Sequence, residues 1–363
     1  MTRKLLTVVG ARPQFIKAAV VSHQLSSANT IEEILVHTGQ HFDYGMSQVF
    51  FDELDIPQPK VNLGISGGSH AQMTAKMLVA LEQTVEDVKP DAVLLYGDTN
   101  STLAAALATS KLHYPIVHVE AGTRTKSMTN PEEINRICTD HISGLLLACT
   151  KENLHNLIAE NLKDKSYFVG DPMMDAFQKY RKIAKCSELI GLDGSRISVP
   201  ASFYYLTCHR EENTRDESTL RGVLSAMNEL DSKVVYPVHP RNHNVVQGLE
   251  DEFKNIIFCN PVGYLESIYL VSNAKQVITD SGGLQREAFF AEVKCTTILD
   301  FQVWPETMVD NRNLLAKPDK NSILSAMGKP QKIDPAYLPF GKGDASVEIV
   351  KHISEFLNQG DCK

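Results

Sequence analysis

Short apolar runs rich in β-branched residues recur along the chain, and segments of helical period separate them. The runs form two series, at residues 5–9, 33–38, 92–99, 115–122, 145–150 and 166–170, and then at residues 202–210, 233–240, 255–260, 276–283 and 296–300. Runs that are apolar throughout, rather than alternating, are typical of parallel strands covered by helices on both faces. The sequence therefore predicts an α/β chain with two doubly wound, Rossmann-like halves.

The length of the chain supports two domains, because 363 residues exceed the usual size of a single hydrophobic core. Between the two series, the segment GLDGSRISVPAS (191–202) is rich in Gly, Ser and Pro and lacks clear periodicity, as a linker would. We place the boundary between residues 180 and 200. The prediction is an N-terminal domain over residues 1–182 and a C-terminal domain over residues 183–344.

Charge and cysteine content exclude several classes of protein. The formal net charge of −8 argues against general binding to nucleic acid or to an anionic membrane. The seven cysteines form no C-x-x-C pair and no His/Cys cluster with metal spacing, so we interpret them as buried thiols in a reducing compartment. No apolar stretch approaches the length that spans a bilayer. These features predict a soluble, cytoplasmic protein that holds any anionic ligand locally.

Motifs of several other enzyme classes are missing from the sequence. The first run leads into GARPQFIK (10–17), with a single glycine in place of G-x-G-x-x-G, which removes most of the support for nicotinamide chemistry. No Asp-x-Asp pair, H-E-x-x-H zinc site or G-x-S-x-G elbow is found. The sequence thus predicts a protein without a metal or a nicotinamide cofactor.

Polar residues follow run after run of both series. Ligands of open α/β sheets bind beyond the carboxyl ends of the strands, so these positions are candidate site residues. They are Arg12, Gln40, His41, Asp98, Glu120, His209, His239 and the segment 280–283. Each one alone has an ordinary explanation, because strand ends are solvated and polar residues cap helices. Their recurrence predicts a binding site at the strand ends.

Structural alternatives stay open for several of these residues. Asp98 or the neighbouring Thr99 would also serve as N-cap of the Ala-rich helix that follows. His239 lies in a proline-rich loop that would accept it as a polar filler, and His209 alone is a weak signal. Arg12 and Lys17, about one helical turn apart, either offset a diphosphate or are solvated surface residues, an alternative that suits Lys17 better.

Residues 276–288, QVITDSGGLQREA, predict a strand, a Gly-rich turn and a helix start. Backbone N–H groups at such a helix start attract phosphate, and Ser281 would add a hydroxyl donor; the alternative is an ordinary N-cap. Glu287, one turn into the helix, has the wrong sign for a phosphate. Its carboxylate suits the two hydroxyls of a ribose.

Residues 118–136, HVEAGTRTKSMTNPEEINR, gather three acids beside basic residues such as Arg136. A helix start with Asn130 as N-cap and Glu133 closing a capping box accounts for part of this pattern. Glu120 stays unexplained. An acid/base cluster on the first half and a phosphate site on the second suit a metal-free reaction at the carbon that carries a nucleotide diphosphate.

Motifs in this order over nearly the whole chain resemble those of the non-hydrolysing UDP-N-acetylglucosamine 2-epimerases. The motifs are GARPQFIK (10–17), HTGQHFDYGMSQVFF (37–51), YGDTNSTLAAALA (96–108), HVEAG-x-R with PEEINR (118–136), CHREEN (208–213), YPVHPR (236–241) and TDSGGLQREA (279–288). The resemblance implies a GT-B-like fold, with a UDP-sugar in the cleft between two Rossmann-like domains. It further implies a C-terminal helix, at about 345–363, that packs back on the first domain, and a homodimer.

The resemblance also implies a reaction. The family interconverts UDP-N-acetylglucosamine and UDP-N-acetylmannosamine by anti elimination of UDP to 2-acetamidoglucal and re-addition, without metal or nicotinamide. Matched motif by motif, its catalytic residues are Asp98, Glu120, Glu132 and His209. Substrate contacts are implied at Arg12, Lys17, Arg136, His239, Ser281, Gly282, Gly283 and Glu287, and His209 also matches a contact to UDP. Which carboxylate is acid and which is base stays open.

A second UDP-sugar binds some bacterial members of the family as an activator, and the resemblance places that site at Gln40 and His41. This chain departs from the pattern there, with Asp43 where glutamine is common and no arginine in residues 64–72, so we expect a weakened activator site. Thr123 stands where the family often has leucine. Val303 and Trp304 replace a Glu-Arg pair, so we expect an anionic-ligand contact to be lost.

Other functions remain as alternatives. A C2 epimerase of a related UDP-2-acetamido sugar, such as a uronic acid or a 6-deoxy sugar, would share all of these motifs. A metal-independent GT-B glycosyltransferase would share the S-G-G turn but has no evident use for three carboxylates. A hydrolysing epimerase usually has a different first turn from residues 12–15, and a silent nucleotide-sugar-binding protein would not need the carboxylates.

Overall fold

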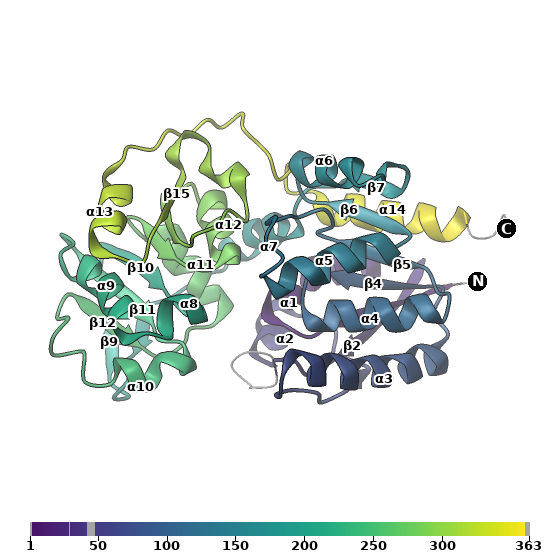
Figure 1. The fold of residues 1–363 in the computed structure, drawn as a ribbon, viewed down its shortest axis with the longest axis horizontal. Helices are drawn as coiled ribbons and strands as arrows, with labels where there is room; N and C mark the ends of the chain where they lie inside the picture. The colour runs from purple at the N-terminus through teal and green to yellow at the C-terminus, as the bar shows by residue number, and fades with distance from the viewer. Residues whose placement is uncertain (1, 29, 42–47, 360–363) are drawn as a thin grey trace. The chain divides into compact units, whose positions relative to one another are not determined.

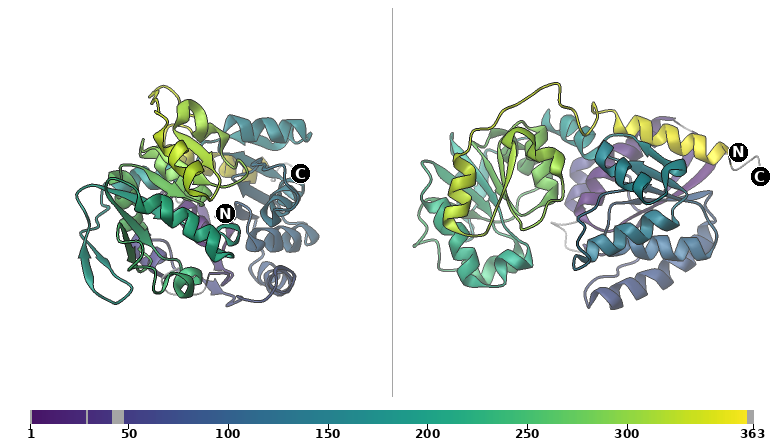
Figure 2. Two further views of the ribbon diagram at one scale, coloured as in Figure 1. Left: turned by 60° about the vertical axis from the view of Figure 1, so that its left-hand side comes forward. Right: turned by 45° about the horizontal axis from the view of Figure 1, so that its top comes forward.

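The computed structural model describes residues 2–28, 30–41 and 48–359, and the chain divides into two compact units. Unit 1 comprises Met1–Gln178 together with Leu338–Lys363, and unit 2 comprises Lys179–Tyr337. Each unit is a sheet with helices packed against it (Figures 1 and 2). Among the helices of the described residues, none has both the length and the apolar character needed to cross a bilayer.

Unit 1 is built on a parallel sheet of seven strands in the order β3-β2-β1-β4-β5-β6-β7. The strands are β1 (Arg3–Val9), β2 (Ile31–His37), β3 (Val61–Asn62), β4 (Ala92–Tyr96), β5 (Ile116–Val119), β6 (Leu145–Ala148) and β7 (Ser166–Phe168). Strands β4, β5 and β6 are buried at every position, which explains their uniformly apolar sequences. The strand order reverses between β1 and β4, which makes this place the topological switch point of the sheet.

Helices pack on this sheet in two groups. Helices α3 (His70–Val88), α4 (Asn100–Lys111) and α5 (Pro131–Ile142) lie side by side, and α1 (Arg12–Ala28) packs against α2 (Gln48–Leu54) and α14 (Ala345–Gln359) (Figure 1). The remaining helices are α6 (Lys151–Ala159), the short 3-10 turn Lys163–Lys165 and α7 (Pro172–Arg181). The start of α14 is held from α7, because the carboxylate of Asp175 accepts the backbone N–H groups of Ala345 at 3.1 Å and Ser346 at 2.7 Å.

Unit 2 has a second parallel sheet, of six strands in the order β12-β11-β10-β13-β14-β15. Its strands are β10 (Phe203–Thr207), β11 (Lys233–Pro237), β12 (Ile256–Cys259), β13 (Val277–Thr279), β14 (Cys295–Ile298) and β15 (Asn313–Ala316). Its helices are α8 (Glu211–Thr214), α9 (Glu217–Asn228), α10 (His243–Val246), α11 (Tyr264–Asn273), α12 (Gly282–Phe290) and α13 (Lys320–Gly328), with 3-10 turns at Pro240–Asn242 and Pro305–Asn311. The switch point of this sheet lies between β10 and β13.

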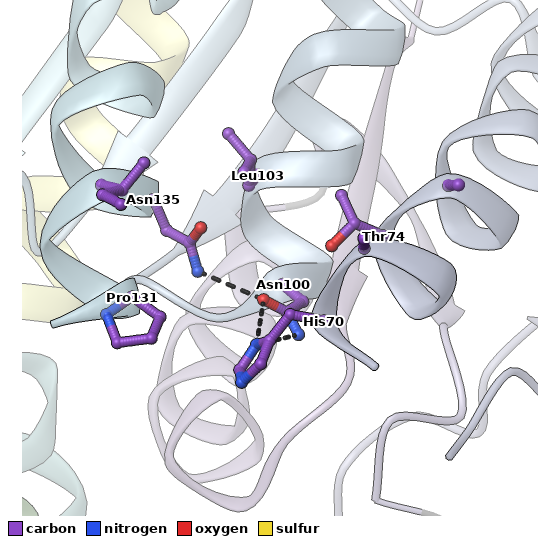
Figure 3. A pocket seen from close by; sticks show the side chains of 9 residues that line it. His70, Thr74, Asn100, Leu103, Pro131 and Asn135 are labelled. Atoms are coloured by element: carbon purple, nitrogen blue, oxygen red, sulfur yellow. Dashed lines mark hydrogen bonds between the residues drawn. The ribbon is translucent and has the colours of Figure 1, made fainter. Parts of the chain in front are cut away.

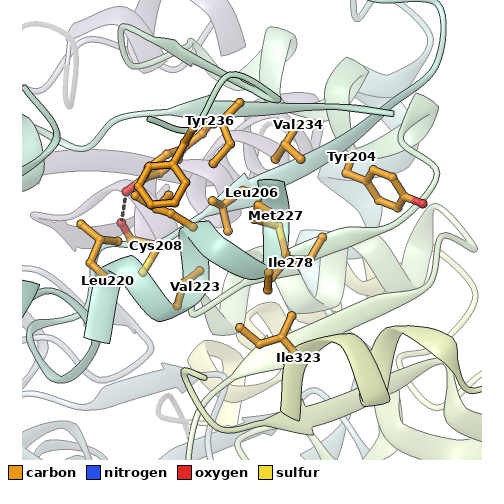
Figure 4. Packing of buried hydrophobic residues seen from close by; sticks show 14 of the residues in the cluster. Tyr204, Leu206, Cys208, Leu220, Val223, Met227, Val234, Tyr236, Ile278 and Ile323 are labelled. Atoms are coloured by element: carbon orange, nitrogen blue, oxygen red, sulfur yellow. Dashed lines mark hydrogen bonds between the residues drawn. The ribbon is translucent and has the colours of Figure 1, made fainter. Parts of the chain in front are cut away.

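The core of unit 2 lies between the sheet and two helices. Strand residues Leu206, Val234 and Ile278 pack against Val223 of α9 and Ile323 of α13, and all five are fully buried (Figure 4). Helices that alternate with parallel strands build both units, so the doubly wound α/β class predicted from the sequence is confirmed.

Segment 191–202, which we interpreted as a linker, contains regular structure. It contains β9 (Arg196–Ser198), which pairs antiparallel with β8 (Glu188–Ile190) across a turn closed by the Gly191 N–H to Ser195 carbonyl bond of 2.8 Å. Each strand has only three residues, which is too short for an alternating pattern to stand out in the sequence. The chain passes from unit 1 to unit 2 earlier, at Gln178–Lys179.

Candidate active site

The turn after β1 explains why GARPQFIK contains a single glycine. The side-chain oxygen of Gln14 accepts the backbone N–H groups of Gly10 (2.8 Å) and Ala11 (3.1 Å), and its amide donates to the carbonyl of Tyr96 at the end of β4. A Cβ atom on Gly10 would lie 2.2 Å from the hydroxyl oxygens of both Thr38 and Ser101. The close approach of Thr38 and Ser101 therefore requires glycine at position 10. The turn lacks the second and third glycines that a dinucleotide fingerprint would have.

Arg12 and the predicted activator residues lie near this turn. The backbone N–H of Arg12 donates to Nδ1 of His41 at 3.1 Å, and its guanidinium lies 5.0 Å from the centre of the Phe50 ring. The side-chain oxygen of Gln40 accepts the backbone N–H (3.2 Å) and the hydroxyl (2.8 Å) of Ser101 in the first turn of α4. Both activator candidates thus adjoin the switch point of unit 1, whereas Asp43 lies outside the described residues.

Lys17 and Glu120 form a buried ion pair at the same switch point. The ammonium of Lys17 lies 2.5 Å from Oε2 of Glu120, and the two side chains are 2 % and 7 % exposed. Glu120 follows β5 with φ +71°, a conformation that costs a non-glycine residue energy and is often found at functional sites. A Cβ on Gly97 would lie 3.4 Å from the ammonium and 3.5 Å from Oε1 of Glu120. The alternative that Lys17 is a solvated surface residue is wrong.

Two further buried groups lie beside Glu120. One ligand-type atom from each of Glu120, Cys149 and Asp171 lies within 4.8 Å of the others. Among the described residues, these three form a group that has the ligand atoms and the spacing to hold a metal ion. The carboxylate of Glu120, however, is already paired with the ammonium of Lys17, and this pairing offsets the negative charge that would attract a metal ion. The predicted absence of a metal stays a prediction.

Asp98 is bound by residues of α5 and does not cap α4. The N-cap is Thr99, whose hydroxyl accepts the backbone N–H of Thr102 at 3.3 Å, so the alternative that Asp98 is the cap is wrong. Arg136 donates from one guanidinium nitrogen to Oδ2 of Asp98, and the amide of Asn135 donates to the Asp98 carbonyl at 2.8 Å. The Asp98 side chain remains 27 % exposed.

Glu133 binds the loop before α5 and does not close the predicted capping box. Asn130 does cap the helix, but its side chain accepts the N–H of Glu132 at 3.0 Å. The Glu133 carboxylate instead accepts the backbone N–H groups of Thr125 (2.9 and 3.0 Å) and Lys126 (2.8 Å). Burial opposes its ionisation, yet these N–H groups and the neighbouring guanidinium hold the pKa of Glu133 below its usual range.

His118 and Asp140 support two of the strand ends, a role the sequence analysis missed. Nδ1 of His118 lies 2.7 Å from Oδ1 of Asp140, and Nε2 lies 2.7 Å from the carbonyl of Gly97, the residue before Asp98. Asp140 also accepts the N–H of Gly122 at 3.0 Å and pairs with Arg124 at 2.8 Å. Arg124 is thus held by Asp140 and Glu160. Neither His118 nor Asp140 follows a strand or sits in a turn, so strand-end reasoning has no means to find them.

A pocket of about 400 Å³ lies across the first turns of α3, α4 and α5. Figure 3 shows Asn100 at its centre, with hydrogen bonds to His70 on one side and Asn135 on the other. Leu103 and Ile134 line the pocket with apolar side chains. The side-chain amide of Asn135 also donates to the carbonyl of Asp98, so Asn135 connects this pocket to Asp98.

In unit 2, Asp280 organises the turn after β10. Its carboxylate accepts the backbone N–H groups of His209 (2.7 Å) and Arg210 (2.8 Å), and its other oxygen lies 3.0 Å from Nδ1 of His209. Burial alone would raise the pKa of Asp280, but the charge of His209 and these donors lower it to about 2. The rings of His209 and His239 stack with centroids 5.5 Å apart, so both predicted histidines lie together beyond the ends of the neighbouring strands β10 and β11.

The S-G-G turn begins a helix as predicted. The hydroxyl of Ser281 accepts the N–H of Leu284 at 3.4 Å, and α12 starts at Gly282. A Cβ on Gly282 would lie 3.6 Å from Nε1 of Trp304, which places the indole against the helix start. The guanidinium of Arg286 lies 4.1 Å from the centre of the Trp304 ring, and both side chains are buried. Gly283 and the buried Glu287 lie on the same helix.

Comparison with known proteins identifies the family of the chain. The family model described as UDP-N-acetylglucosamine 2-epimerase matches residues 23–354, which is most of the chain. The chain belongs to the UDP-N-acetylglucosamine 2-epimerase family. The resemblance read from the motifs is therefore confirmed.

Relatives within the epimerase family carry two different substrate names. A Methanococcus maripaludis protein named UDP-N-acetylglucosamine 2-epimerase homolog is 43% identical over 96% of this chain and 98% of its own. A Pseudomonas aeruginosa protein named UDP-2,3-diacetamido-2,3-dideoxy-D-glucuronate 2-epimerase is also 43% identical, over 97% of this chain and 99% of its own.

Solved structures support the GT-B-like assignment for this epimerase-family chain. The Methanocaldococcus jannaschii UDP-GlcNAc 2-epimerase, in complex with UDP-GlcNAc and UDP, matches 97% of this chain and 99% of its own with a TM-score of 0.87 and 35% identity. A lipopolysaccharide outer core galactosyltransferase matches with a TM-score of 0.52 at 15% identity, which shows a shared fold alone. The predicted GT-B-like fold is confirmed.

Proposed function

We propose that this chain catalyses non-hydrolysing C2 epimerisation of a UDP-2-acetamido sugar, interconverting UDP-N-acetylglucosamine and UDP-N-acetylmannosamine. Family membership supports the reaction class. The observation that carries the proposal is the pair of carboxylate–cation contacts at one switch point, Lys17 with Glu120 and Arg136 with Asp98. Groups of this kind at the carboxyl ends of strands suit proton transfer and cation stabilisation.

Elimination gives these carboxylates a purpose. The C2–H bond of the sugar has no adjacent carbonyl, so direct proton abstraction would need an extremely strong base. Departure of UDP builds oxocarbenium character at C1 and makes the C2 proton acidic. One carboxylate stabilises that charge while another accepts the proton, which yields 2-acetamidoglucal and UDP. Re-addition of UDP, with a proton delivered to the other face of C2, completes the epimerisation.

Roles in this proposal divide between the two units. Asp98, Glu120, Glu132 and His209 serve the chemistry at C1 and C2. The resemblance predicts contacts to the UDP-sugar at Arg12, Lys17, Arg136, His239, Ser281, Gly282, Gly283 and Glu287. The capped start of α12 supports phosphate binding, because its first N–H groups have no partner within the helix. The buried carboxylate of Glu287 supports a bond to the ribose hydroxyls.

Amide substitutions test the proposed chemistry. We expect Asp98→Asn, Glu120→Gln and Glu132→Gln each to lose ~10²–10⁴-fold in turnover while UDP affinity is kept, because the general acid–base contribution is of that size. Turnover and C2 deuterium uptake are measured by proton NMR in heavy water, and UDP affinity by calorimetry. Glu152→Gln, on an exposed carboxylate of α6, is the matched control. A wild-type enzyme that takes up no deuterium at C2 would refute the proposal.

A second candidate substrate is UDP-2,3-diacetamido-2,3-dideoxy-D-glucuronate, because the relative named for it is as similar as the one named for UDP-N-acetylglucosamine. The same NMR assay with both sugars separates the two. The substrate with the higher kcat/KM is assigned to the chain. A glycosyltransferase would incorporate no deuterium into either sugar.

We further propose that the protein is a cytoplasmic homodimer with a weakened activator site at Gln40 and His41. Both side chains adjoin the switch point, which supports a site next to the substrate. Light scattering measures the subunit number. Initial-rate curves without sigmoidal shape are expected from a weakened activator site, and strongly sigmoidal curves would contradict it.

A further inference from the structure

Arg136 lies between two carboxylates that belong to different parts of unit 1. One guanidinium nitrogen donates to Oδ2 of Asp98 after β4, and another lies 2.5 Å from Oε2 of Glu133 on α5. The side chains of Arg136 and Glu133 are only 4 % and 1 % exposed. A guanidinium so deeply placed, with two carboxylate partners, has little surface left for a ligand.

Glu133 is a fixed anchor for this guanidinium. Its carboxylate accepts three N–H contacts from Thr125 and Lys126 in addition to the bond from Arg136. The many donors keep Glu133 ionised despite its burial, because hydrogen bonds to the charged form favour that form. The loop that follows Glu120 and the guanidinium that binds Asp98 therefore share one support.

Helix α5 holds Asp98 at two points. Arg136 binds the carboxylate, and Asn135 binds the backbone carbonyl at 2.8 Å. The guanidinium takes Oδ2, while the Asp98 side chain stays 27 % exposed. A charge-assisted bond of this kind fixes the orientation of the acceptor.

We propose that Arg136, anchored by Glu133, is a positioning residue that aims the Asp98 carboxylate at the sugar, rather than a residue that contacts the substrate. The inference rests on the proposed function, in which Asp98 takes part in chemistry at C1 and C2. Glu133 acts on the Asp98 carboxylate only through Arg136. Misplacement of a catalytic group by about 1 Å costs on the order of 10²-fold in rate, so loss of either partner lowers turnover more than binding.

The test is a double-mutant cycle on turnover. We compare Arg136→Met, Glu133→Gln and the double variant with wild type, and we expect Arg136→Met to lower kcat by ~10²-fold with KM and UDP affinity nearly unchanged. Because Glu133 works through Arg136, the double variant is no slower than Arg136→Met alone. Arg221→Met, which removes an exposed guanidinium paired with Glu217 and Glu252 in unit 2, is the control and keeps wild-type rates.

Chemical rescue separates positioning from a general loss of structure. Added methylguanidinium is expected to restore part of the turnover of Arg136→Ala, and Arg136→Lys to be faster than Arg136→Met because it keeps a donor for Asp98. If the methionine and alanine variants fail to fold, the double-mutant cycle is measured with Arg136→Lys and Glu133→Gln instead. The thermal melting curve of each variant checks that it is folded.

Three outcomes overturn the inference. A tenfold rise in KM with kcat unchanged would make Arg136 a substrate contact. Multiplicative effects of the two single variants would separate Glu133 from Arg136. Absence of rescue in a folded Arg136→Ala variant, with Arg136→Lys no better than Arg136→Met, would remove the role of the guanidinium. A wild-type protein without C2 exchange is a different result, because it refutes the proposed function itself.

Discussion

Charged side chains at the strand ends are bound in pairs, and the partners come from distant parts of the chain. Glu120 binds Lys17 of α1, Asp98 binds Arg136 of α5, and Asp280 binds His209 after another strand. Each pair puts a carboxylate beside a group that can carry positive charge, and for Asp280 this neighbour helps to lower the pKa to about 2. Single residues thus have their partners fixed by the fold before any ligand binds.

Asp280 makes a pH-dependent contribution to stability. Its pKa falls from 3.8 to about 2 on folding, so the contribution is present above about pH 4 and is lost as the pH falls toward 2. A shift of that size corresponds to about 2 kcal/mol. We expect Asp280→Asn to lower the free energy of unfolding at pH 7 and the difference from wild type to shrink at pH 3. Urea titrations at both pH values measure it, with the exposed Asp334→Asn as control.

A difference between the two proteins that stays constant from pH 7 to pH 3 would contradict this assignment. It would mean that Asp280 stabilises the turn by its hydrogen bonds to His209 and Arg210 alone, independent of its charge.

Residue types at strand ends were predictable from the sequence, but their partners were not. Hydrophobic runs mark where strands end, and polar residues there stand out as candidates such as Asp98, Glu120 and His209. The partner of each one depends on how helices pack on the sheet, and no local pattern encodes that packing. Glu133 illustrates the limit, because its spacing from Asn130 fits a capping box while its carboxylate binds Thr125 and Lys126.

Helices in this fold are tied to strand ends and to each other by side-chain bonds. Helix α5 supports β4 and β5 through Arg136 and Asp140, and α14 begins on a carboxylate supplied by α7. Asp175 also accepts the hydroxyl of Ser346 at 2.7 Å. A helix whose cap comes from another helix is held by tertiary packing rather than by its own sequence.

Asp175→Ala is expected to loosen α14 in particular. Loss of a side-chain cap costs about 0.5–2 kcal/mol, and here two N–H groups and one hydroxyl lose their acceptor. Hydrogen exchange followed by mass spectrometry should show faster exchange across Ala345–Gln359. Asp319→Ala removes the N-cap of α13 in unit 2 and is the matched control.

Equal acceleration of exchange in α14 by both variants would show that global unfolding, and not the cap, governs this helix. Elements such as β4, whose sequence is apolar throughout, were predictable, whereas the cap of α14 was not, because Asp175 and Ser346 are far apart in sequence. The short hairpin of β8 and β9 was also missed, since three-residue strands leave no pattern.

The molecule as a whole consists of one continuous and one discontinuous unit. Unit 2 is the uninterrupted stretch Lys179–Tyr337, whereas unit 1 needs both Met1–Gln178 and Leu338–Lys363. The sequence predicted two α/β halves because strand and helix patterns repeat twice. It predicted the return of the last helix only through family resemblance, since an amphipathic helix at a chain end gives no sign of the sheet it covers.

Lys179–Tyr337 expressed alone should fold cooperatively, because it has its own sheet, core and helices on both flanks. We expect a single thermal transition by circular dichroism and UDP binding by calorimetry, since the α12 start and Glu287 lie within it. The stretch 1–178 alone leaves the face of α1 that α14 covers exposed, and it serves as the comparison, with lower solubility and a lower melting temperature expected. A continuous unit that unfolds without cooperativity would show that it depends on unit 1.

The capture of α14 by Asp175 has a consequence for the order of events during synthesis. A ribosome releases the N-terminus of unit 1 first, yet the helix that covers α1 emerges only after the whole of unit 2. Unit 2 is complete before that point, so the domain that starts second can finish folding first. Until α14 leaves the ribosome, the face of α1 that it covers stays exposed on the nascent chain, where a chaperone can bind it.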